Sequence, residues 1–164
     1  MTKKEIIMNK ITEMENEIKN LKQEIGKQEE LERRWKPELD GRYWFIDDDG
    51  NTFFSRWDND AIDNSRYKFG NVFKTEEEAD FTAEQFKVIA ELKNYAGYDK
   101  EWNGKNGHWY IGYETNEGCL SVNFCQYIKK IPFNIYFSSK ESAENAINAI
   151  GKDRLKKYYF CMEK

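Results

Sequence analysis

Three aspartates and an arginine stand close together in the stretch WDNDAIDNSRYKFG. Asp58, Asp60 and Asp63 offer carboxylates for calcium binding or for general acid–base catalysis, and Arg66 follows them. A calcium loop of the EF-hand type needs an oxygen ligand at its fifth position, but counting from Asp58 that position is Ile62. Acid–base catalysis would also need a second partner and a pocket, and the sequence reveals neither. The pattern therefore predicts no metal or catalytic residue here.

The residues that usually carry other chemistries are equally sparse. His108 is the single histidine of the chain, which argues against a catalytic triad or a metalloprotease motif. Cys119, Cys125 and Cys161 lack the paired spacing of zinc sites, and alternation places the first two in strands as packing residues. No glycine-rich phosphate loop occurs. We therefore expect a protein that is not an enzyme and needs no cofactor.

Two interpretations of the aspartate-rich stretch stay open. In the first it is a polar connection over residues 58–65, whose short side chains bond their own backbone while Arg66 satisfies a nearby carboxylate. In the second it is an exposed recognition loop that binds a partner protein. The partner-binding residues would then be Trp57, Asp58, Asp60, Asp63 and Arg66.

A heptad pattern marks the N-terminal segment, residues 1–34, as a coiled-coil helix. Isoleucine at the a positions with leucine-like residues at d favours a parallel two-stranded coil, so we expect a homodimer. In that register the flanking g and e positions pair charges of opposite sign. A long helix that packs back on its own domain is the alternative. The expected dimer interface consists of Ile7, Ile11, Met14, Ile18, Leu21 and Ile25.

The remainder, residues 35–164, is predicted to be one α+β globular domain that follows a break at Pro37. Two hairpin signals occur, around Asp49-Gly50 and around Asn116-Glu117-Gly118. After each hairpin come a predicted third strand and a helix, which suggests ββ(β)α half-repeats over about 42–96 and 107–160. A mainly antiparallel sheet with helices on one face follows from this order.

The helices of the two half-repeats carry explicit start signals. Thr75 and Ser139 are predicted N-caps, and Glu78 completes a capping box with Thr75. Gly151 is placed to end the second helix, and residues 155–162 read as a last strand. The expected buried stripes are Phe81, Phe86, Ile89 and Leu92 in the first helix, and Ala143, Ala146, Ile147 and Ile150 in the second.

Composition and charge narrow the classes of partner. Hydrophobic residues make up 39% of the 164 residues and aromatic residues 16%, enough for a packed core. Residues 38–84 carry five basic and thirteen acidic side chains, a net charge of −8, which disfavours direct nucleic-acid binding. Residues 85–164 carry twelve basic and nine acidic ones, a net charge of +3. Without an apolar run of membrane or signal length, we expect a cytoplasmic protein with reduced thiols and no membrane contact.

The stretches WDNDAIDNSRYKFGNVFKTEEEA, upstream WKP and downstream KVIAELK resemble a group of mostly hypothetical proteins from phages and prophages of Gram-positive bacteria. The resemblance runs from Trp35 to about Phe160 and implies a phage origin but no catalytic residues. The overall profile is also similar to that of inhibitors of bacterial immunity. It favours a phage accessory protein that binds and inhibits a host defence protein, such as a CRISPR effector or another immune protein, as anti-CRISPR proteins do.

Two other functions fit the sequence. The basic segment 152–159, with its aromatic residues, suits a nucleic-acid-binding or regulatory module. A virion or scaffold component is the third option.

Overall fold

A computed structural model describes residues 3–32, 34–96, 107–126 and 134–162. The fold is mixed helix and sheet, as predicted. The elements are, in order, α1 (Lys3–Glu32), β1 (Arg42–Ile46), β2 (Thr52–Arg56), α2 (Ala61–Phe69), α3 (Glu76–Ala96), β3 (His108–Glu114), β4 (Cys119–Cys125), α4 (Lys140–Ile150), α5 (Lys152–Arg154) and a π-helix, η1 (Leu155–Tyr159).

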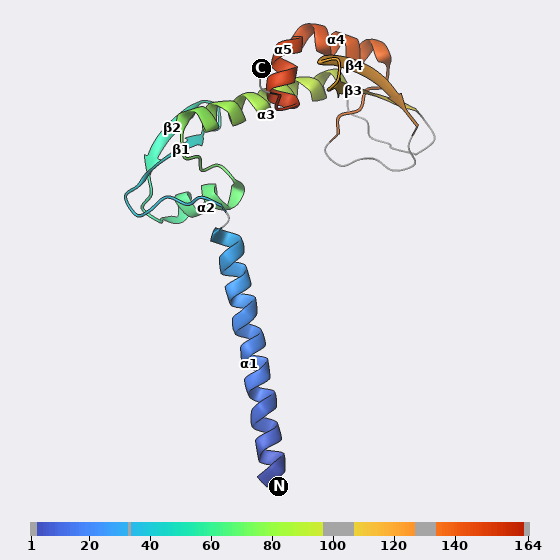
Figure 1. The fold of residues 1–164 in the computed structure, drawn as a ribbon. Coiled ribbons are helices and arrows are strands. Elements are labelled where there is room, and N and C mark those ends of the chain that lie inside the picture. Colours follow the sequence, from blue (N-terminus) through green and yellow to red (C-terminus); the bar gives the residue numbers. More distant parts are fainter. Residues whose placement is uncertain (1–2, 33, 97–106, 127–133, 163–164) are drawn as a thin grey trace.

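Helix α3 connects two small α+β units (Figure 1). It contacts the β1–β2 hairpin, α4 and η1, and Phe81 in its second turn already packs against Tyr158 of η1. Helix α1 projects away from the first unit as a stalk. Within the described residues the strands form two separate two-stranded sheets, so the expectation of one continuous sheet is wrong.

Both predicted hairpins are confirmed. In the first, the N–H of Asp47 donates to the carbonyl of Asn51 at 2.9 Å, and Gly50 adopts a φ of +78°, which few side-chain-bearing residues tolerate. In the second, the N–H of Gly118 donates to the carbonyl of Glu114 at 2.8 Å. Trp44 lies opposite Phe54 in the first register and Trp109 opposite Phe124 in the second.

The predicted third strands shrink to single bridges. Trp44 and Phe73 exchange two backbone hydrogen bonds of 2.9 Å each, and Trp109 and Phe137 exchange two of 3.0 and 2.7 Å. In the first unit, the Asn71 side chain both accepts from and donates to the backbone of Ile46, so it takes the place of the next strand residue. The side-chain amide of Asn71 thus makes the two hydrogen bonds that the backbone of a second paired residue would otherwise make.

The helix caps follow the sequence, but one buried stripe does not. The N–H of Glu78 donates to Thr75 Oγ1 at 3.2 Å, and that of Ser142 donates to Ser139 Oγ at 3.1 Å. The α4 stripe is buried as predicted. In α3 the expectation for Phe86 is wrong, because 55% of this residue is exposed. The buried residues of α3 are Ala79, Ala83, Val88, Leu92 and Ala96.

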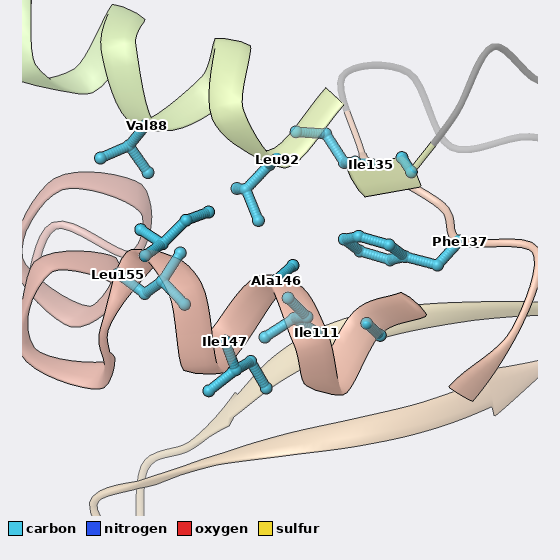
Figure 2. Close-up of a cluster of buried hydrophobic side chains, with 11 residues drawn as sticks. Val88, Leu92, Ile111, Ile135, Phe137, Ala146, Ile147 and Leu155 are labelled. Atoms are coloured by element: carbon cyan, nitrogen blue, oxygen red, sulfur yellow. The ribbon is translucent and has the colours of Figure 1, made fainter. Parts of the chain in front are cut away.

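The predicted last strand is also wrong. The chain restarts as helix at Lys152 and continues as the π-helix, in which the N–H of Phe160 donates to the carbonyl of Leu155 at 3.1 Å. Leu155 is fully buried against α3 and α4 in the main core (Figure 2). The helical path places Leu155 and the aromatic residues after it against that core. An extended strand would instead have paired its backbone with a neighbouring strand.

Among the residues that the structure describes, two hydrophobic clusters of buried side chains stand out. The larger joins Val88 and Leu92 of α3 to Ile147 of α4, Ile111 of β3 and Phe137 (Figure 2). The smaller lies in the first unit and consists of Tyr43, Trp57, Tyr67 and Val72, with Phe45 packed beside them. The aspartate-rich stretch therefore belongs to a second, aromatic core.

Candidate functional site

The expected polar connection over residues 58–65 is largely a helix, α2. Asp60 is its N-cap and accepts from the N–H of Asp63 at 2.7 Å. Gly70 ends it with a φ of +97°, and its N–H donates to the carbonyls of Arg66 and Tyr67. The expectation of a non-helical connection is wrong for residues 61–65, which belong to α2. The predicted bonding of short side chains to the local backbone is confirmed, since Asp60 accepts from the N–H of Asp63 and Asp63 accepts from that of Asp58.

Asp63 is a buried structural carboxylate. It is only 4% exposed, and it accepts from the Tyr43 hydroxyl at 2.6 Å and from the N–H of Asp58 at 2.7 Å. Arg66 Nη1 donates to the same Tyr43 oxygen at 2.9 Å. Burial, followed by the bond to Asp63, raises the pKa of Tyr43 above its ordinary value. This network ties β1 to both ends of the aspartate-rich stretch.

Trp57 is a core residue and lies outside any recognition surface. It is 2% exposed, and its ring meets those of Tyr43 and Tyr67 edge-on at 5.8 and 6.0 Å. Arg66 is half-buried, with its guanidinium 3.5 Å from the centre of the Phe45 ring. The expectation that Trp57 and Asp63 lie exposed for a partner is therefore wrong, because both complete the first unit's interior.

The same cluster also contacts Arg34 and Lys36, which follow α1 in the sequence. Lys36 Nζ lies 5.1 Å from the centre of the Trp57 ring, and the Arg34 guanidinium lies 5.1 Å from that of Tyr67. The Tyr67 hydroxyl donates to the carbonyl of Arg34 at 3.1 Å. The segment around WKP and the aspartate-rich stretch thus meet in the first unit, and the hydrogen bond from Tyr67 to Arg34 spans 33 positions of the sequence.

The outer face of α2 is the part of this stretch that a partner can reach. Phe69 is 84% exposed and Ile62 is 59% exposed. They are seven residues apart, so they lie on one side of the helix. Asp58 and Asp60 are exposed at its N-terminal end, and Lys68 is exposed beside Phe69. We call these five residues the α2 face.

Ile62 and Phe69 are not among the predicted partner-binding residues, because the sequence predicts a loop for this segment. Their spacing, combined with the buried Asp63 and Tyr67 on the opposite side, was a helical signal in the sequence. Asp58 and Asp60 are the predicted partner-binding residues that are exposed, although one carboxylate oxygen of Asp60 is engaged as the N-cap of α2. Arg66 contributes through the packing beneath the face.

The sulfur and imidazole groups are dispersed. His108 lies opposite Cys125 across the second hairpin, while Cys119 is at its other end and Cys161 is exposed near the C-terminus. Burial raises the pKa of the Cys125 thiol above its ordinary value. Among the residues that the structure describes, no three His, Cys, Asp or Glu side chains gather in a way that could hold a metal ion.

The predicted dimer seam is exposed along α1. The exposed fractions of its six residues run from 44% at Ile11 to 61% at Met14. Packing of this seam on the chain's own domain, the alternative raised by the sequence, is therefore not what the structure has. No helix among the described segments is long and apolar enough to cross a membrane.

Comparisons of the chain with protein-family models, with curated proteins and with solved structures found no match.

Proposed function

We propose that this protein works by binding another protein through the α2 face. The observation that carries the proposal is Phe69, a phenylalanine 84% exposed on a helix with a defined N-cap and C-cap. Exposed apolar groups ringed by polar ones mark interaction sites, and binding energy concentrates in a few such anchors. Phe69 and Ile62 are the anchors, and the charged residues around them form the rim.

The partner is a protein with a basic surface. Residues 38–84 carry the net charge of −8, and Asp58 and Asp60 place two exposed carboxylates at the end of the α2 face. Opposite charge on the partner would raise the association rate, and salt would screen that effect. A basic nucleic-acid channel of a host enzyme is one such surface.

Binding, with no reaction of its own, is the activity that we assign. The resemblance to phage and prophage proteins of Gram-positive bacteria supports a role against the host, and we propose inhibition of a defence protein of the CRISPR type. In that role the carboxylates would occupy a site meant for nucleic acid. Neither a metal ion nor a cofactor takes part in this proposal.

We also propose that α1 pairs two copies of the chain as a parallel coiled coil. An apolar seam that is about half exposed over three heptads costs solvation energy unless it is covered, and a second copy covers it with matching spacing. In the a/d register, Lys10 faces Glu15 of the second copy and Glu17 faces Lys22. Such a dimer would carry two α2 faces, which favours avid binding.

The two α+β units are, we infer, two copies of one half-repeat. Trp44 and Trp109 hold equivalent positions, since each pairs across its hairpin with an exposed phenylalanine and bridges to a second one. Ala79 and Ala143, each completely buried, sit four residues after the capping Thr75 and Ser139. In this interpretation α2 gives the first copy a binding face.

A plating experiment tests the function. Phage plaques are counted on a Gram-positive host with active CRISPR immunity that expresses the wild-type protein, Phe69→Ser or Phe86→Ser. Phe86 is an exposed phenylalanine of α3 outside the α2 face, so it is a matched control. We expect the wild type and Phe86→Ser to restore plaques and Phe69→Ser to fail. Restoration by all three, or by none, would contradict the proposal.

A further inference from the structure

A cavity of ≈ 980 Å³ opens between α3, β3 and the C-terminal helical segment, on the opposite unit from the α2 face. Its volume lies at the upper end of the range of small-molecule sites. The wall combines aromatic rings with cationic side chains. The lining residues are Phe81, Tyr113, Asp153, Arg154, Lys156, Lys157, Tyr158, Cys161 and Met162.

Three aromatic rings supply flat apolar surface. Phe81 of α3 and Tyr158 of η1 lie 5.2 Å apart between ring centres, and Tyr113 comes from β3. All three residues are partly exposed, so each contributes some ring surface to the cavity wall. A planar ring stacked on such a surface gains binding energy whatever its substituents.

The lysines of η1 bring positive charge to the same space. Lys156 Nζ donates to the carbonyl of Gly118 at 2.6 Å and lies 5.9 Å from the centre of the Tyr113 ring. Lys157 is exposed, with Nζ 4.8 Å from the centre of the Tyr158 ring. Both ammonium groups therefore stand beside the rings that would hold a planar ligand.

Arg154 has a different part in the cavity. Its guanidinium donates to both carboxylate oxygens of Glu91, at 2.7 and 2.9 Å, and to Glu84, at 3.3 and 3.2 Å. These bonds, led by the one to Glu91, raise its pKa and lock the segment onto α3. The π-helix that follows is a conformation often found at functional sites. By bonding Glu84 and Glu91, Arg154 holds the segment just before Lys156 and Lys157 on α3.

We propose that this cavity binds a mononucleotide, with the base against the aromatic rings and the phosphate at Lys156 and Lys157. The combination of flat rings and two ammonium groups fits a ligand that joins a planar ring to an anion. Asp153 in the wall, together with Glu84 and Glu91 behind Arg154, would repel the further phosphates of a strand. The site therefore favours a free nucleotide over a polynucleotide.

Titration of the full-length protein tests this inference. AMP, GMP, CMP and UMP are titrated separately by calorimetry and by NMR, beside adenosine, inorganic phosphate and a ten-residue oligothymidylate. We expect at least one mononucleotide to bind one site per chain, about tenfold or more tightly than nucleoside or phosphate alone. The absence of mononucleotide binding at millimolar concentration, or binding of the oligonucleotide alone, would overturn it.

A pair of variants locates the site. Lys157→Gln removes a cation from the cavity wall, and Lys152→Gln removes an exposed one of the same segment outside the wall. We expect Lys157→Gln to weaken binding by roughly tenfold and Lys152→Gln to leave it unchanged. Equal affinity of the two variants would overturn the placement. If Lys157→Gln melts early, perturbation of the Tyr113 and Tyr158 resonances in the wild-type titration decides the placement.

Discussion

Replacement of Asp63 by alanine should be the most damaging change among the three aspartates of the α2 region. Asp63 is buried and accepts from the Tyr43 hydroxyl and from the N–H of Asp58 at 2.6 and 2.7 Å. Hydrogen bonds to a charged group contribute about 1.5–3 kcal/mol each, and truncation leaves both donors without this acceptor. We therefore expect the free energy of unfolding to fall by roughly 3–5 kcal/mol. That is a large share of the 5–15 kcal/mol of an ordinary domain.

The neighbouring aspartates supply graded controls. Asp60→Ala removes the N-cap of α2 and should cost about 1 kcal/mol. Asp58→Ala removes an exposed carboxylate and leaves the buried N–H bond intact, so the expected change is within about 0.5 kcal/mol. Urea denaturation followed by circular dichroism measures all three, and a constant m-value would show that each change acts on stability. Equal losses in the three variants, or a loss below about 1 kcal/mol for Asp63→Ala, would refute the network.

Three further predictions concern assembly, pH and thiol reactivity. Ile18→Glu places charge in the α1 seam and should convert a dimer to a monomer in sedimentation, whereas Asn16→Glu, on the opposite side of the helix, should not; a wild-type monomer would contradict the coiled coil. The pKa of Glu84 is lowered, first by the bond from Lys87 and then by Arg154, so its contribution to stability is present above the ordinary value of 4.5 and is lost as pH falls through the lower folded-state pKa. Glu84→Gln should therefore show a shallower fall of melting temperature below pH 4.5, and an unchanged acid limb would contradict this. The exposed Cys161 should react with a thiol reagent well before Cys125, which is buried and has a raised pKa. Mass spectrometry of the labelled peptides measures the order, and earlier labelling of Cys125 would contradict its burial.

Local signals carried the parts of the fold that depend on neighbours in sequence. The two hairpins were predictable because Asp49-Gly50 and Asn116-Glu117-Gly118 favour tight turns. The caps at Thr75 and Ser139 were predictable because a hydroxyl at that position satisfies a nearby N–H whatever the rest of the chain does.

Long-range packing decided the parts that the sequence did not reveal. Asp63 was taken for a surface carboxylate because its partner Tyr43 lies 20 residues away and no local pattern joins them. Helix α2 was missed because Asn and Asp also favour turns, and the burial of Tyr67 beside Trp57 decides between the two. The sequence predicted a strand over residues 155–162, where the adjacent aromatic residues Tyr158, Tyr159 and Phe160 favour an extended conformation. The burial of Leu155 in the main core accompanies the helical path instead.

The most direct test of binding through the α2 face compares the host proteins that the wild type and two variants retain. Full-length wild type, an Ile62→Ser/Phe69→Ser double variant and Phe86→Ser are immobilised, exposed to extract of a Gram-positive host with active CRISPR immunity, and the retained proteins are quantified by mass spectrometry. We expect the wild type and Phe86→Ser to retain a basic defence protein and the double variant to lose it. Rising salt concentration should release the retained protein. Equal retention of that protein by all three, with normal melting of each, would contradict binding through the α2 face.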